Sequence, residues 1–125
     1  MNINEVLAIV ERQCSGAERK EEIRHLSLLE KRIINEVLSN YPEAVYDRNF
    51  AGYTPDTDGS EVLLAESPYD QMYVHYLLAQ HYLLMLEQGH YNIQINLFNS
   101  LYDDYKIFCA RNMRADTKNN RYRVR

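Results

Sequence analysis

The sequence has no tryptophan, only two cysteines and four glycines, and no run of eighteen apolar residues. Cys14 and Cys109 stand alone without CxxC spacing, which favours a reducing compartment over a disulfide framework. A transmembrane helix would need a longer apolar run, and the first residues lack the basic and apolar regions of a secretory signal. We therefore expect a soluble protein made in the cytoplasm, with no contact with a membrane.

Sequence motifs for catalysis or ligand binding are also missing. No Walker, GxGxxG, HExxH, GxSxG or EF-hand pattern occurs. His75 and His81 are six residues apart, so on one helix they point roughly 120° away from each other, which is unsuited to joint metal binding. Asp56 and Asp58 near Gly59 resemble half of a calcium loop but are typical of a turn. We predict a protein that is not an enzyme, with no catalytic residue, no cofactor and no metal site.

Charge is distributed unevenly along the chain, whose net charge is −4. From Lys106 to Arg125, seven basic residues stand against one acid, Asp116, giving +6, whereas the first 105 residues carry seven bases and seventeen acids, giving −10. A basic end on an acidic body indicates that the end meets an acidic surface or nucleic acid. A solubilising tail is the plainer alternative.

Apolar residues recur at helical spacing in four segments and predict an all-α fold, a small bundle of about four helices in one domain over residues 1–115. The last residues, 116–125, have one aliphatic side chain and are interpreted as a basic, flexible tail. The expected helices cover 3–14, 15–40, 67–88 and 91–115.

Local signals place the helix boundaries. Ser15 to Glu18 has the form of a capping box, Tyr41-Pro42 ends the second helix, and Ser67-Pro68 is the strongest start signal. Gly89 is expected to end the third helix. The side chains expected to be buried along the third and fourth helices are Tyr69, Met72, Tyr73, Tyr76, Leu77, Ala79, Leu83, Leu84 and Leu86, then Phe98, Leu101, Tyr105 and Phe108.

Between the second and third helices, a long loop over residues 41–66 lacks periodicity, and ordered loops of this length are usually functional. Val62 to Leu64 could form a short extended segment that pairs with Phe50 to Tyr53. Tyrosine is abundant, at eleven residues, and suits surfaces where a small domain meets a partner. In the loop we predict partner binding by Tyr46, Phe50 and Tyr53, whereas core packing is the favoured role of the helical tyrosines.

The stretch from Gly52 to about Asn112 resembles a known family. It contains a Gly-Tyr-Thr turn, the aliphatic run Glu61 to Leu64, Ser-Pro-Tyr-Asp-x-Met-Tyr from Ser67, a tyrosine-rich helix, then Tyr-Asn and Leu-Phe-Asn-Ser-x-Tyr ending at Tyr102. In these features the chain is similar to the small α-helical head–tail connector, or adaptor, proteins of tailed bacteriophages and prophages, especially those of Firmicutes.

The resemblance implies a non-enzymatic structural protein of the virion, made in the cytoplasm of the bacterial host. Its copies would assemble as a homo-oligomeric ring between the portal protein and the tail or its stopper (tail-completion) protein. DNA would pass through the channel without sequence-specific binding. In such adaptors the C-terminal segment docks on the portal, so we expect partner binding by the tail residues Lys118, Arg121, Tyr122, Arg123 and Arg125.

A second hypothesis is a small nucleic-acid-binding or regulatory protein, of phage or host, that uses the basic tail. The acidic body argues against it, because it repels phosphate and no expected helix carries a basic stripe.

Overall fold

The computed structural model describes residues 1–113, and those residues form an all-α fold, as predicted. No strand occurs among them. Within them, no helix has the length and apolar character needed to cross a membrane. The elements are the helices α1 (Ile3–Gln13), α2 (Arg19–Glu36), α3 (Gln71–Leu84) and α4 (Gln88–Asn112), with a short 3₁₀ helix η1 (Leu38–Asn40) after α2.

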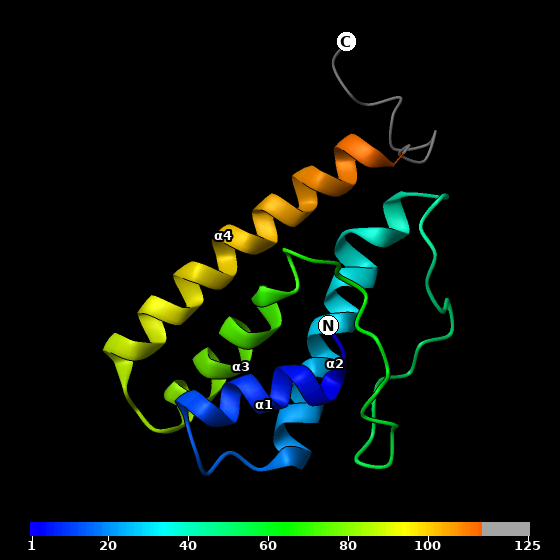
Figure 1. Ribbon diagram of the computed structural model, residues 1–125. Coiled ribbons are helices and arrows are strands. Elements are labelled where there is room, and N and C mark those ends of the chain that lie inside the picture. Colours follow the sequence, from blue (N-terminus) through cyan, green and yellow to red (C-terminus); the bar gives the residue numbers. More distant parts are fainter. Residues whose placement is uncertain (114–125) are drawn as a thin grey trace.

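Helix α3 lies at the centre of the bundle, in contact with α1, α2 and α4 (Figure 1). Helix α4 runs antiparallel along α3, and the long loop descends the opposite side of the molecule. Because α3 has neighbours on three sides, its buried residues occupy more than one stripe: they are Met72, Tyr73, Val74, Leu77, Leu78 and Ala79. The expected burial of Leu83, Leu84 and Leu86 is wrong, because these side chains are 47%, 77% and 89% exposed.

The first two helices bury the apolar faces predicted for them. Their boundaries differ, however, from the sequence-based expectation. The capping box forms at α1, where the Glu5 amide donates to Asn2 Oδ1 at 2.8 Å and the Asn2 amide donates to Glu5 Oε1 at 2.9 Å. At Ser15 it does not form, because Gly16 has a φ of +95° and cannot be helical. Helix α2 therefore begins at Arg19.

Helix α3 is shorter than expected at both ends. The chain enters it through a turn whose amides bond three residues back, and the Asp70 carboxylate pairs with the Met1 ammonium at 3.2 Å. At its other end, the amide of Leu86 donates to Leu83 O at 3.2 Å and that of Glu87 to Tyr82 O at 2.9 Å. These two bonds form a Schellman motif with Leu86, at a φ of 59°, in the left-handed position. Gly89 was expected to end α3. It lies instead in the first turn of α4.

Candidate interaction surfaces

Glu30 of α2 holds the long loop against the bundle. Its side chain is fully buried, and Oε2 accepts hydrogen bonds from the Tyr53 hydroxyl at 2.9 Å and the Leu64 amide at 3.0 Å. Oε1 accepts from the Tyr73 hydroxyl at 2.5 Å, and that hydroxyl in turn accepts from the Ala65 amide at 2.9 Å. One carboxylate thus joins α2, α3 and two points of the loop.

The electrostatics of this network follow from burial. Burial raises the pKa of Glu30, and hydrogen bonds from Tyr73, the Leu64 amide and Tyr53 oppose that rise. The pKa values of Tyr53 and Tyr73 are raised by burial and by the nearby Glu30 carboxylate, so both hydroxyls keep their protons and remain donors. The sequence analysis missed Glu30, although the signal was present, since it occupies a position on the apolar stripe of α2 between Leu26 and Ile33.

A second attachment explains the Gly-Tyr-Thr turn. Gly52 has a φ of +113°, and a Cβ at this position would lie 3.3 Å from Ser27 Cβ. The adjacent Tyr53 amide donates to Ser27 Oγ at 2.6 Å, and Ser27 Oγ donates to Tyr53 O at 3.1 Å. Only glycine combines this backbone conformation with so close an approach to α2. The turn therefore has a structural role in attaching the loop.

The segment Val62 to Leu64 pairs with the start of the chain and not with Phe50 to Tyr53. An isolated antiparallel bridge joins Asn2 to Val62, and the Leu63 amide donates to Met1 O at 3.0 Å. Leu63 is buried in the core. The expectation of an extended segment was thus correct, and its predicted pairing partner was wrong because residues distant in sequence supplied the hydrogen bonds.

The structure gives the three loop residues predicted to bind a partner different environments. Tyr46 is partly buried and its hydroxyl accepts from Arg48 Nη1 at 2.9 Å, with the guanidinium 4.7 Å from the ring centroid. Phe50 packs edge-on against Tyr53, at 5.0 Å between centroids. The Tyr53 hydroxyl already has an internal acceptor, so this side chain anchors the loop. Binding of a partner by these residues stays a prediction. The predicted tail residues Lys118, Arg121, Tyr122, Arg123 and Arg125 lie outside the described residues.

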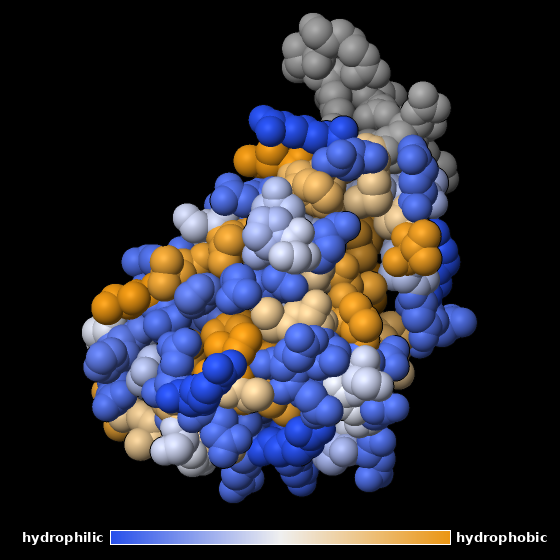
Figure 2. All heavy atoms as spheres, viewed as in Figure 1, coloured by the Kyte–Doolittle hydropathy of each residue, from blue (hydrophilic) through white to orange (hydrophobic). Residues whose placement is uncertain are grey.

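An exposed apolar surface occupies the turn between α3 and α4 and continues along α4. Figure 2 shows hydrophobic side chains along the outer edge that α4 forms in Figure 1. Apolar side chains gathered in this way on a small domain are typical of binding sites. The residues of this surface, with their exposed fractions, are Leu84 (77%), Met85 (57%), Leu86 (89%), Ile93 (58%) and Leu97 (44%).

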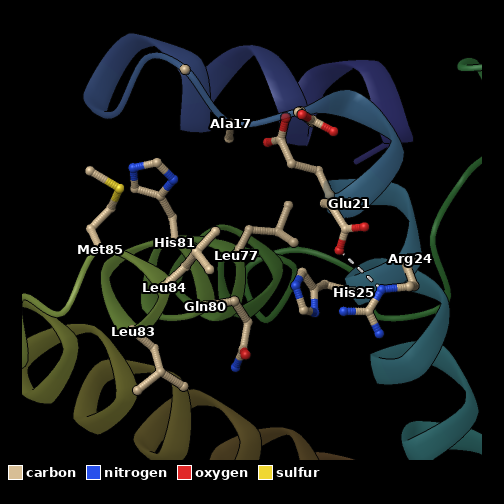
Figure 3. Close-up of a pocket in the computed structure, with 13 residues that line it drawn as sticks. Ala17, Glu21, Arg24, His25, Leu77, Gln80, His81, Leu83, Leu84 and Met85 are labelled. Carbon is tan, nitrogen blue, oxygen red and sulfur yellow. Dashed lines mark hydrogen bonds and ion pairs between the residues drawn. The ribbon is translucent and has the colours of Figure 1, made fainter.

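A groove of about 440 Å³ lies beside this surface, between the start of α2 and the second half of α3. Figure 3 shows Leu77, His81 and Leu84 of α3 pointing toward the turn that carries Ala17, while His25 approaches from α2. The groove thus has an apolar floor on α3. Its opposite side carries three acidic side chains and one basic side chain, which are Glu18, Glu21, Glu22 and Arg24.

On the acidic side of the groove, the three carboxylates have different environments. Glu21 pairs with Arg24 at 3.1 Å, but Glu22 Oε2 is buried and has no hydrogen-bond partner in that part of the chain. Burial raises the pKa of Glu22 to about 7, with a further contribution from the charge of Glu11. Burial also lowers the pKa of His25, which keeps this imidazole neutral at pH 7. The groove is therefore suited to a ligand that is both apolar and cationic.

The two histidines of α3 serve no shared site. His75 Nδ1 is 2.7 Å from Gln94 Oε1 of α4, a contact that joins the two helices. His81 lies in the groove wall. Across residues 1–113, no group of three or more histidine, cysteine, aspartate or glutamate side chains is placed to hold a metal ion.

Comparison of the chain with protein-family models, with curated proteins and with solved structures finds no match. The structure itself defines an all-α protein with a long, firmly attached loop and an exposed apolar surface.

Proposed function

We propose that this protein is a non-enzymatic head–tail connector subunit of a tailed bacteriophage, which assembles as a ring between the portal and the tail or its stopper protein. A closed ring of identical subunits needs two different surfaces on each copy, which match head to tail. The observation that supports the proposal is the presence of two different surfaces on opposite sides of the bundle. The long loop occupies one side of the bundle, and the exposed apolar turn between α3 and α4 occupies the other (Figure 1).

The mode of attachment of the loop supports the same role. A subunit that packs between neighbours has to present its loop in one conformation, since ordering a loop on binding lowers affinity. Glu30, Ser27 and the N-terminal segment fix the loop at separate points before any partner arrives. The motifs that resemble connector proteins include Gly52 and Tyr53, which make two of these attachments.

Disrupting the gene in the phage that encodes it tests the proposal. The expected result is DNA-filled heads and separate tails that fail to join, restored by the gene supplied in trans. Normal infectious particles from the disrupted phage would contradict it. Salt-dependent DNA binding by the purified chain, lost on deletion of residues 116–125, would favour the nucleic-acid-binding alternative.

A further inference from the structure

We infer that the groove between α2 and α3 binds the C-terminal segment Arg121 to Arg125 of a second copy of this chain. The inference rests on the proposed self-association and deepens it, because it names the surfaces that join neighbouring subunits. It rests on three observations: the composition of the groove, the sequence pattern of the segment, and the distance from the end of α4 to the groove.

The groove and the segment have complementary chemistry. The segment reads Arg-Tyr-Arg-Val-Arg, so that in an extended conformation Tyr122 and Val124 point to one side and the three arginines to the other. The groove has the same division, with apolar side chains on α3 and acidic ones on α2. Tyrosine and valine side chains match the α3 floor, where Leu84 is 77% and Met85 is 57% exposed.

Arginine matches the acidic side in a more specific way. Its planar guanidinium carries five donors, which suit carboxylates that still have free acceptor capacity. Glu18 is such a carboxylate, since it lines the groove and is exposed. The one basic residue of the lining, Arg24, is already paired with Glu21.

The positions of the two surfaces indicate binding between copies. Helix α4 has 25 residues, so Asn112 lies about 36 Å from the turn next to Met85 at which α4 begins. The thirteen residues from Met113 to Arg125 span at most about 45 Å when fully extended. The segment would have to be extended over most of its length to reach the far end of its own groove, a constraint that binding to a second copy does not impose. A segment that follows the end of α4 and an acceptor groove near the start of α4 would make a head-to-tail contact, which is the type of interface from which closed rings are built.

Two full-length variants, each with one half of the contact disrupted, allow this contact to be tested independently of other contacts between copies. The groove variant carries Glu18→Lys and Leu84→Lys, at exposed positions, and keeps its C-terminal segment. The tail variant carries Arg121→Glu, Arg123→Glu and Arg125→Glu, and keeps its groove. Circular dichroism first checks that both are folded. Each variant alone lacks one half of the contact and cannot self-associate through it. A mixture can form the contact once, between the groove of the tail variant and the segment of the groove variant, so assembly ends at a 1:1 complex.

The measurement is an NMR titration of the ¹⁵N-labelled tail variant with the unlabelled groove variant. We expect chemical-shift changes at the amides of Gly16, Ala17, Leu84 and Met85, and a 1:1 complex by sedimentation. Raising the salt concentration from 0.05 to 0.5 M should weaken it by about tenfold or more. A control variant with Leu86→Lys alone, which alters the same turn outside the groove and keeps both halves of the contact, should self-associate as wild type does.

Several results would overturn the inference. An unchanged spectrum on mixing, or shifts confined to amides outside the groove, would show that the segment does not bind there. A concentration-independent difference between wild type and the tail variant at the groove amides would place the segment in its own subunit. Because a ring can also form through other surfaces, failure here leaves the gene-disruption result as a separate test of the connector role.

Discussion

Removing the Glu30 carboxylate tests how the long loop is held. Glu30→Ala takes away the acceptor of three hydrogen bonds and leaves the Tyr53 hydroxyl and the Leu64 amide without a partner. Each buried polar group without a partner costs about 1–3 kcal/mol. Burial raises the pKa of Glu30, which shows that the buried charge is itself unfavourable. Removing that charge offsets part of the loss. We expect a net loss of about 3 kcal/mol, a large share of a small domain's stability.

A matched pair of variants isolates the effect of burial. Glu30→Gln keeps the shape of the side chain and one acceptor oxygen. It should lower the free energy of unfolding by about 1 kcal/mol, mainly because the Tyr73 hydroxyl loses the acceptor for its proton. Glu36 also accepts from a tyrosine, the Tyr102 hydroxyl at 2.7 Å, but its side chain is 50% exposed. Glu36→Gln should therefore change stability by less than about 1 kcal/mol, because water replaces the lost bond.

Urea denaturation followed by circular dichroism measures these differences, and hydrogen exchange reports the loop itself. In Glu30→Ala, the amides of Tyr53 and Leu64 should exchange faster than in wild type, with α1 less affected. A loss below about 1 kcal/mol for Glu30→Ala, or unchanged exchange at Leu64, would refute the reasoning that a single buried carboxylate fixes the loop.

Four further outcomes are expected. Since burial raises the pKa of Glu22 to about 7, wild type loses stability as pH rises from about 4.5 to 7, and Glu22→Gln should be more stable by roughly 1 kcal/mol at pH 8 but not at pH 4. Leu86→Gly should raise the free energy of unfolding by about 0.5–1 kcal/mol because Leu86 has a φ of 59°, and Gly89→Ala should also stabilise, as position 89 is helical. Deleting residues 118–125 should leave helical signal and melting nearly unchanged but, by removing the proposed contact between copies, abolish ring formation and with it co-assembly with the portal.

The number and type of helices could be predicted from the sequence because apolar periodicity is a local property. Ile3, Val6, Leu7 and Val10 are buried on α1 as the 3.6-residue spacing indicated. Helix ends were predicted less well, since they depend on backbone angles that several residues can adopt. The left-handed residue after α3 is Leu86, although Gly89 was the better candidate by intrinsic preference.

The attachments of the loop could not be predicted, because they join residues far apart in sequence. Glu30 and Tyr73 are 43 positions apart, and no local pattern pairs them. Likewise, Tyr53 was interpreted as a partner-binding side chain because loop tyrosines often are, but its hydroxyl is committed to Glu30. The groove is formed by residues of both α2 and α3, which are distant in sequence. From the sequence alone, its acidic residues are therefore predicted only to lie on the exposed face of a helix.

Electron microscopy of the purified protein mixed with a portal protein encoded in the same genome tests the proposed connector role most directly. If the proposal is correct, we expect a closed ring of this chain stacked on one end of the portal, with an open channel along the common axis. Absence of any bound density at protein concentrations well above those in an infected cell, with both components folded, would contradict it.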